Sequence, residues 1–297
     1  MKLAVIGGGH MGRLHAQKIE RLPGVELAAV VDRDPKRGSI ADYRQIIPQV
    51  QAAVVSVPTD QHHEVARACL EGGVHVLIEK PMTVTLAEAD ELIALASRKS
   101  LVLQVGHVQR YSPAFRALTA RMNRPIYIEA ERLSAFKQRG AEVDVVLDLM
   151  IHDLDLALAL ARSEVTQISA CGFRVLTKDI DIANARLEFA SGCVANLSAS
   201  RVSQAALRKL RVFQNDLYVS ADLQGGKLRY VRQAGGNIQE QEENHGEGDA
   251  LMEQMKSFSS SILEKTPVAV DGKAGREALR VGIEVGRLVR ERLERFA

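Results

Sequence analysis

The segment from Val145 to Ala161, VVLDLMIHDLDLALALA, carries acid–base groups in an otherwise apolar stretch. At 3.6 residues per turn, Asp148, His152 and Asp155 (i, i+4, i+7) fall on one stripe of a helix. Histidine is the side chain that ordinarily titrates near neutral pH, so His152 beside Asp148 could serve as a general base. A core histidine with a satisfied hydrogen bond would explain the same pattern. Asp153 lies off the stripe and is expected at the helix surface or between domains.

A glycine-rich turn at the N-terminus predicts a dinucleotide site. Gly7, Gly9 and Gly12 fit G-x-G-x-x-G between the apolar run KLAVI and a helical segment, and Asp32 ends the next apolar run. In this context the helix N-terminus would hold a pyrophosphate and the acidic residue a ribose. A Gly-rich turn without a ligand is the alternative. The predicted cofactor contacts in this turn are Gly7, Gly9, His10, Met11 and Gly12.

The end of the second apolar run bears on the choice of cofactor. The Asp32 carboxylate would accept hydrogen bonds from ribose hydroxyls and repel a 2′-phosphate, which favours NAD. Arg33, Lys36 and Arg37 follow directly, so NADP stays open, and Arg33 is a further predicted cofactor contact. Asp32 could also be a turn-forming residue of DRDP.

A lysine follows another apolar run, VHVLI, in the sequence Glu79-Lys80-Pro81. Ligands of open α/β sheets bind outside the carboxyl ends of the strands. An ammonium group there could polarise a hydroxyl or carbonyl beside a nicotinamide. Considered alone, the motif would more simply be a surface lysine at a strand end.

Four segments together carry a resemblance: GGGHMGRLHAQ, VVSVPTDQHHEVARACLEGGVHVLIEKPM, LQVGHVQRYSPAF and LDLMIHDLDLAL. They resemble the Gfo/Idh/MocA oxidoreductases over nearly the whole chain. The resemblance implies an α/β protein with an N-terminal Rossmann domain and a C-terminal α/β domain that has a large, mostly antiparallel sheet. It also implies NAD-dependent oxidation of sugar or inositol hydroxyls.

The resemblance further implies roles for individual residues. Lys80 matches the lysine near the hydride-transfer carbon, and Asp148 and His152 match the catalytic pair, which would also contact the substrate. Asp155 matches an acid that supports the histidine. Whether Lys80 or His152 is the base stays open. The residues implied to border the cofactor are Pro58, Thr59, His62, Glu79 and Lys80.

Within the family, VGHVQRYSPAF and VVLDLMIHDLDLAL are most similar to bacterial enzymes that oxidise the 3-hydroxyl of UDP-N-acetylglucosamine. The 3-keto product would feed a pyridoxal-phosphate aminotransferase of lipid A synthesis. Alternatives are the corresponding uronate 3-dehydrogenase, inositol 2-dehydrogenase, an NAD-dependent glycoside hydrolase and an inactive NAD sensor. Arg110 and Tyr111 are candidate substrate contacts, and Arg132, Lys137 and Arg139 form a weaker set.

The arrangement of elements must position these groups. Residues 1–108 alternate buried-type strands with helices, which predicts a parallel sheet covered on both faces and an NAD-binding domain. Residues 109–297 carry successive alternating strands and a helix at 274–296, which predicts a substrate-binding and oligomerisation domain. The domains would share a cleft, and the sheet would form a homodimer or homotetramer.

Three local features add to this organisation. Thr85 and Glu88 form a capping-box pattern, and residues 235–249 are the best candidate for a mobile loop. The stretch 33–51 is ~15–20 residues shorter than a usual strand–helix–strand crossover. Either that crossover is deleted or residues near Gly38 and Ser39 are absent from the sequence.

Bulk composition excludes several classes of protein. The formal net charge of +2 gives no sign of a nucleic-acid or anionic membrane partner. No apolar run reaches the ~20 residues of a membrane span. The three cysteines are scattered, which argues against a disulfide framework or a metal site and fits a reducing cytoplasm.

Overall fold

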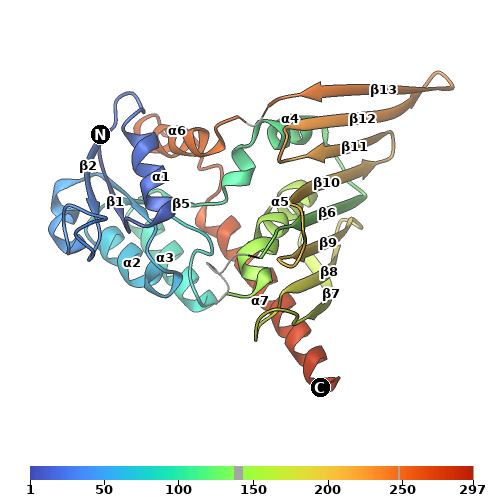
Figure 1. The fold of residues 1–297 in the computed structure, drawn as a ribbon. Helices are drawn as coiled ribbons and strands as arrows, with labels where there is room; N and C mark the ends of the chain where they lie inside the picture. Colours follow the sequence, from blue (N-terminus) through green and yellow to red (C-terminus); the bar gives the residue numbers. More distant parts are fainter. Residues whose placement is uncertain (137–142, 247, 297) are drawn as a thin grey trace. The chain divides into compact units, whose positions relative to one another are not determined.

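The computed structural model of the chain describes residues 1–136, 143–246 and 248–296, which form two compact units (Figure 1). The first unit contains Met1–Val108 and Asp249–Leu279, and the second contains Gln109–Gly248 and the residues from Arg280 onward. Each unit is built on one sheet, so the predicted α/β class is confirmed. No helix in the described ranges has the length and apolarity needed to cross a membrane.

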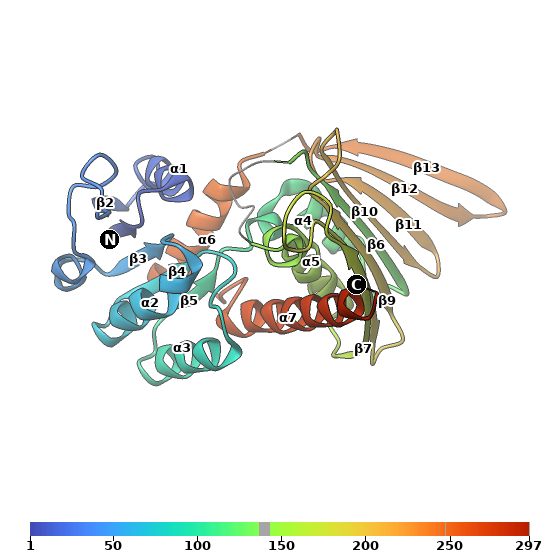
Figure 2. The same ribbon diagram turned by 60° about the horizontal axis from the view of Figure 1, so that its bottom comes forward.

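The first unit is built on a five-stranded parallel sheet in the order β2-β1-β3-β4-β5. Its strands are β1 Lys2–Ile6, β2 Glu26–Val31, β3 Ala52–Val55, β4 His75–Ile78 and β5 Leu103–Val105. Its helices are α1 His10–Ile19, α2 His62–Glu71, α3 Leu86–Arg98 and α6 Ala250–Leu263. The central strands are buried along their length, as a sheet covered on both faces requires. Helices α2 and α3 pack side by side (Figure 2), and α3 begins with the predicted capping box of Thr85 and Glu88.

Helix α6 packs on the same apolar core as α1. Met255, Phe258 and Ile262 are buried in one cluster with Leu3 and Ile19 of the sheet and α1. The sequence prediction placed everything after residue 108 in the second domain. The chain instead returns after Gly248 to cover the first sheet, because this apolar face of α6 is buried there.

The short segment between β2 and β3 contains two 3-10 helices, η1 Tyr43–Gln45 and η2 Ile47–Gln49, in place of a crossover helix. The chain turns back after Asp32, and the Ser39 amide donates to the Val30 carbonyl at 2.8 Å. A Cβ at Gly38 would lie 2.4 Å from the Asp32 amide nitrogen, so the turn requires glycine there. The segment is therefore a tight return that packs on the edge of β2.

The second unit is built on an eight-stranded sheet in the order β13-β12-β11-β10-β6-β9-β8-β7. The strands are β6 Tyr127–Leu133, β7 Val165–Phe173, β8 Ile182–Phe189, β9 Val194–Ser200, β10 Leu207–Gln214, β11 Leu217–Asp222, β12 Lys227–Ala234 and β13 Asn237–Asn244. Neighbouring strands are antiparallel except β6 and β9, which are parallel. The predicted mostly antiparallel sheet is confirmed.

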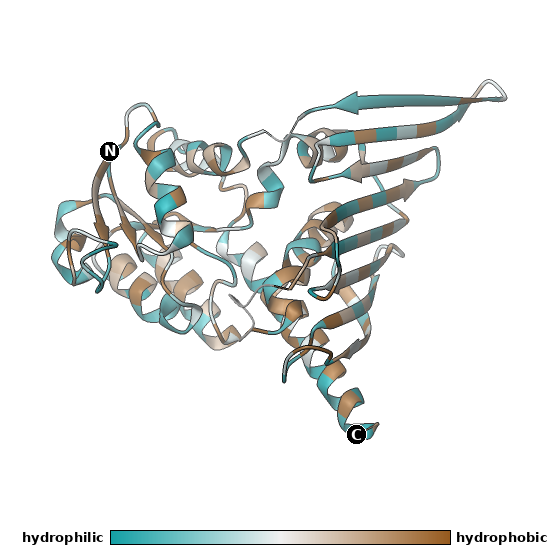
Figure 3. Cartoon of the chain, in the orientation of Figure 1, coloured by the Kyte–Doolittle hydropathy of each residue, from teal (hydrophilic) through white to brown (hydrophobic). Residues whose placement is uncertain are grey.

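The prediction of a mobile loop at 235–249 is wrong. Most of that stretch is strand β13, which is antiparallel to β12. In this register Asn237 pairs with Ala234 at one end and Asn244 pairs with Lys227 at the other. The strand is mostly hydrophilic (Figure 3), with Ile238 as its one large apolar residue, and it is exposed on both faces. An edge strand without a buried face lacks the apolar alternation by which strands are recognised in sequence.

Helices cover one face of the second sheet. They are α4 Pro113–Arg121, the π-helix Val146–Met150, α5 Ile151–Ala161 and the later part of α7 Gly272–Arg295. Their apolar sides share a core with inward side chains of the strands, including Ile128, Leu197 and Val212. The opposite face carries an aromatic trio in which Phe213 lies 5.4 Å from Tyr127 and 4.8 Å from Tyr218, between ring centroids.

Candidate active site

The glycine-rich turn has the geometry of a pyrophosphate site. Gly7 has a φ of +102°, and a Cβ there would lie 2.5 Å from the Ser56 carbonyl carbon. A Cβ on Gly12 would lie 1.8 Å from the Gly7 oxygen, so α1 can approach β1 only with glycine at that position. A Cβ on Gly9 would meet nothing within 4 Å. Gly9 also caps α1 without a side-chain hydrogen bond, so the first amides of the helix can face an anion.

Asp32 lies beside this turn, at the end of β2. Its two carboxylate oxygens accept hydrogen bonds from the Gly8 amide at 2.8 Å and the Asp34 amide at 2.9 Å. A carboxylate has about four acceptor positions, so the half-buried Asp32 can still accept from ribose hydroxyls. The turn and Asp32 together fit a dinucleotide. Of the other predicted contacts here, His10 and Arg33 are exposed and Met11 is half-buried.

Lys80 is the second residue after β4, and its peptide bond to Pro81 is cis. The Lys80 side chain is half-buried, whereas Glu79 is buried and accepts a hydrogen bond from His15 Nε2 at 2.7 Å. Burial opposes ionisation of Glu79, but the hydrogen bond and charge of His15, with the charge of Lys80, lower its pKa below the ordinary value. The Glu79 carboxylate is turned toward His15 of α1, and its position beside the cofactor stays a prediction.

Pro58, Thr59 and His62 follow β3. Pro58 is exposed and Thr59 is half-buried, so both can border a ligand. His62 is buried, and its ring nitrogens lie 2.9 Å from the Pro81 carbonyl and 3.0 Å from the Val57 carbonyl. Burial lowers the pKa of His62, so the neutral ring donates to one of these two oxygens. His62 therefore connects the segments after β3 and β4, and its contact with the cofactor stays a prediction.

The helical segment that carries the acid–base stripe is not one regular helix. Val146–Met150 is a π-helix, and α5 follows it from Ile151. Asp148 and His152 are half-buried, whereas Asp153 and Asp155 are buried. π-Turns within helices occur frequently at functional sites. The four polar residues therefore fall into two groups, and only Asp148 and His152 reach an accessible surface.

The two buried aspartates each form a bidentate ion pair. Asp155 accepts from Arg110 Nε and Nη2, both at 2.7 Å. Asp153 accepts from Arg132 Nε at 2.8 Å and Nη2 at 2.7 Å. Paired carboxylates of this kind fix a helix against its neighbours. The expectation of a surface or interdomain position for Asp153 is wrong, because its Arg132 partner in β6 holds it inside the second unit.

These pairs change the set of candidate substrate contacts. Arg132 is 4% exposed and committed to Asp153. Arg110 keeps 19% of its side chain exposed but is held by Asp155, and Tyr111 is 5% exposed. Arg110 is thus half-buried in an ion pair and Tyr111 is buried, and their contact with substrate stays a prediction. Lys137 and Arg139 lie outside the described residues.

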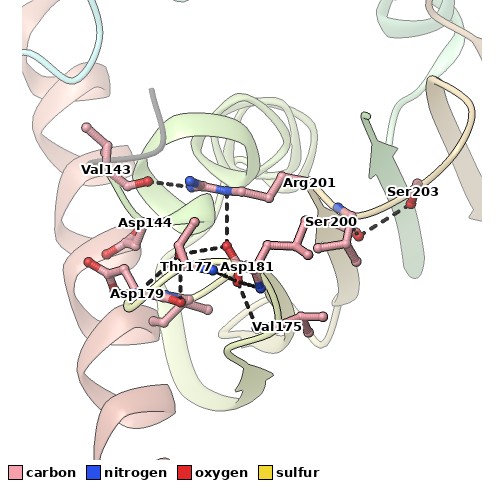
Figure 4. Close-up of polar contacts among 12 residues, drawn as sticks. Val143, Asp144, Val175, Thr177, Asp179, Asp181, Ser200, Arg201 and Ser203 are labelled. Carbon is pink, nitrogen blue, oxygen red and sulfur yellow. Dashed lines mark hydrogen bonds and ion pairs between the residues drawn. The ribbon is translucent and has the colours of Figure 1, made fainter. Parts of the chain in front are cut away.

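Contacts in the second unit also fix the start of the segment that carries Asp148. Asp181 accepts backbone hydrogen bonds from Val175, Leu176 and Thr177 and one from the Thr177 hydroxyl (Figure 4). Arg201 lies 3.9 Å from Asp181 and donates to the Val143 carbonyl. Burial opposes ionisation of Asp181, but these hydrogen bonds outweigh it and lower its pKa to about 2.

No group of three or more His, Cys, Asp or Glu side chains within the described ranges is arranged to hold a metal ion. The side chains of the candidate site, Lys80 in the first unit and Asp148 and His152 in the second, can supply acid–base and electrostatic chemistry. The sequence motifs did not predict the contact of His15 with Glu79 beside Lys80. His15 lies inside GGGHMGRLHAQ, but its partner Glu79 is 64 residues away, and no local pattern connects them.

Known protein families match a part of each unit. Residues 1–107 match the family model described as oxidoreductase family, NAD-binding Rossmann fold, and residues 115–216 match the Gfo/Idh/MocA C-terminal domain. The chain belongs to the Gfo/Idh/MocA oxidoreductase family. The family prediction made from the motifs is confirmed, and the first unit is an NAD-binding Rossmann domain.

Individual relatives cover the chain from end to end. The UDP-N-acetylglucosamine 3-dehydrogenase of Acidithiobacillus ferrooxidans is 38% identical over an alignment of 310 positions, gaps included, that covers 99% of each chain. A solved structure of that enzyme superposes with a TM-score of 0.93 at 37% identity, covering 97% of each chain. The myo-inositol 2-dehydrogenase of Thermotoga maritima is 24% identical over an alignment of 339 positions, which covers 98% of this chain and 97% of the relative.

Proposed function

We propose that the chain oxidises the 3-hydroxyl of UDP-N-acetylglucosamine to a 3-keto nucleotide sugar with NAD. The observation that carries this proposal is the 38% identity, over 99% of each chain, to the UDP-N-acetylglucosamine 3-dehydrogenase of Acidithiobacillus ferrooxidans. The inositol dehydrogenase that spans the chain is 24% identical. The nucleotide sugar is therefore the better-supported substrate, and inositol is the competing one.

The side chains have complementary roles in this reaction. His152 accepts the proton of the hydroxyl, and Asp148, half-buried in the preceding π-turn, orients the imidazole or contacts the sugar. The Lys80 ammonium stabilises the negative charge that develops on the oxygen. NAD, when bound, accepts the hydride from the carbon. Gly9, the α1 amides and Asp32 hold the dinucleotide.

The surroundings of Lys80 help to choose between the two candidate bases. Glu79 is buried beside Lys80, and the charge of Lys80 contributes to lowering the pKa of Glu79. Such coupling is mutual, so the ionised Glu79 favours the protonated form of Lys80. A lysine is ordinarily an ammonium at neutral pH, and in that form it stabilises an oxyanion rather than accepting a proton. We therefore assign the base to His152.

A substrate panel with matched variants tests this proposal. NADH formation is followed with UDP-N-acetylglucosamine, its uronate, UDP-glucose and myo-inositol. His152→Ala and Lys80→Ala should each lower kcat by about 10²–10⁴-fold, the range of general acid–base and oxyanion contributions. His63→Ala, which removes a half-buried histidine 2.9 Å from Glu91, should leave kcat unchanged. Full turnover of a folded His152→Ala protein would refute the assignment of the base.

We also propose the setting in which the enzyme acts. The 3-keto product would pass to a pyridoxal-phosphate aminotransferase that forms a 3-amino sugar for lipid A in the cytoplasm. The three cysteines are free thiols, which suits a reducing compartment. The aromatic trio of Tyr127, Phe213 and Tyr218 on the open sheet face supports a homodimer or homotetramer through that face. Sedimentation of the wild type and of Phe213→Ser compares their oligomeric states.

A further inference from the structure

We propose that His15 is a positioning residue for Lys80, acting through Glu79. The proposal rests on the proposed role of Lys80 in oxidation and adds a residue that the family motifs did not single out. His15 lies on α1 with no exposed surface, and its Nε2 is 2.7 Å from Glu79 Oε1. The other Glu79 oxygen, Oε2, accepts from the backbone amide of Lys80 at 3.3 Å. One carboxylate thus connects the dinucleotide-binding helix to the residue that carries the ammonium.

The space around Glu79 leaves its side chain little freedom. A Cβ on Gly106 would lie 3.0 Å from both Glu79 Cδ and Oε2, so the carboxylate is packed against the backbone after β5. On the other side of Lys80, the His62 ring lies 2.9 Å from the Pro81 carbonyl. Both neighbours of Lys80 in the chain therefore contact a buried histidine. Glu79 contacts His15, and Pro81 contacts His62.

The charges in this cluster give His15 a second effect on Lys80. The charged or titratable groups near Glu79 include His15 from α1, His62 from α2 and the adjacent Lys80, and the buried His107 follows the Gly106 backbone that packs on the carboxylate. A buried carboxylate is strongly destabilised unless hydrogen bonds and opposite charge compensate it. The hydrogen bond and charge of His15 lower the pKa of Glu79. A negative charge on Glu79 favours the charged form of a neighbouring lysine, so a change at His15 should reach Lys80 through Glu79.

Helix α1 also links this cluster to the cofactor site. Gly9 and Gly12, at the start of the helix, form the pyrophosphate site, and His15 lies less than one turn beyond Gly12. Any shift of α1 would therefore move the hydrogen-bond donor of Glu79 together with the amides that face the pyrophosphate. A single element positions both the dinucleotide and the catalytic lysine.

The variants His15→Ala, His15→Gln and Glu79→Gln test the proposal in the full chain. Glutamine places an N–H donor near the position of His15 Nε2, so His15→Gln should retain most of the wild-type behaviour. His15→Ala should lower kcat for UDP-N-acetylglucosamine by about 10–100-fold, as outer-shell partners of site residues typically do, with KM changed less. The Kd for NAD should stay within about threefold of wild type. His63→Ala removes a histidine from a partly exposed His–Glu pair and is the matched control.

A second readout needs no substrate. Lysines are reductively methylated with ¹³C-formaldehyde, and the Lys80 signal is assigned from Lys80→Arg and titrated by NMR. Lys80 should titrate at lower pH in His15→Ala and Glu79→Gln than in the wild type, His15→Gln and His63→Ala. If no sugar is oxidised, the proposed function fails while the titration still decides the role of His15. A His15→Ala protein that is merely less heat-stable, with wild-type kcat and Lys80 titration, would overturn the proposal.

Discussion

Replacing Asp155 by alanine tests whether the buried ion pair with Arg110 fixes the helix that carries His152. The change removes a carboxylate with 1% exposed side chain that accepts two hydrogen bonds of 2.7 Å. Removing one partner of a buried pair costs about 3–5 kcal/mol, because the other charge loses its compensation. Arg110 is 19% exposed and can recover some hydration, so we expect about 3 kcal/mol.

The assay is urea unfolding followed by circular dichroism, with the free energy taken from the transition of the second unit. Glu188→Ala is the matched control, because Glu188 pairs with Arg186 at 3.3 Å with both side chains nearly half exposed. Exposed pairs contribute about 0–1 kcal/mol. The double variant Arg110→Met, Asp155→Leu should recover most of the loss, since apolar groups of similar volume replace buried ion pairs at little cost. An Asp155→Ala protein as stable as Glu188→Ala would refute the reasoning.

Three further predictions concern other sites. Asp181→Asn should lower the free energy of unfolding at pH 7 by about 2 kcal/mol, because the pKa of the Asp181 carboxyl is about 2 in the fold against 3.8 ordinarily. This carboxyl stabilises the fold above pH 4 and ceases to do so as the pH falls toward 2. The free energy of unfolding, measured from pH 7 to pH 2, should therefore depend less on pH in the variant than in the wild type. Gly12→Ala should lower the melting temperature and abolish NAD binding, because its Cβ would lie 1.8 Å from the Gly7 oxygen. Gly9→Ala, whose Cβ would meet nothing within 4 Å, should weaken NAD binding without loss of stability. Calorimetry measures the melting temperature and the NAD affinity, and equal melting temperatures of the two variants would contradict the geometry. Asp32→Ala should lower the NAD preference over NADP about 10–100-fold in kcat/KM, the value of a hydrogen bond to a charged group; an unchanged ratio would exclude Asp32 from ribose recognition.

The elements that bury an apolar face could be predicted from sequence. Strands β1, β3 and β4 are continuous apolar runs, and the alternation of β8 follows its buried face. Strand β13 could not be recognised, because neither of its faces is buried. Helix α6 was not predicted, and its assignment to the first unit depends on contacts with Leu3 and Ile19 more than 200 residues away.

The candidate site shows the same division. The spacing of Gly7, Gly9 and Gly12 predicted a geometry that the structure reproduces, since it reflects contacts within one strand–helix turn. The Asp-His-Asp stripe did not show which carboxylates are committed elsewhere. Their arginine partners, Arg110 and Arg132, come from other elements, and only the fold brings them to α5.

The most direct test of the proposed function is the identity of the oxidised carbon. The wild-type chain is incubated with NAD and UDP-N-acetylglucosamine, a carbonyl-reactive hydroxylamine is added to trap a ketone as its oxime, and the product is analysed by NMR and mass spectrometry. We expect stoichiometric NADH and a carbonyl at C3 of an intact nucleotide sugar. NADH formation with myo-inositol and none with UDP-N-acetylglucosamine would contradict the proposal.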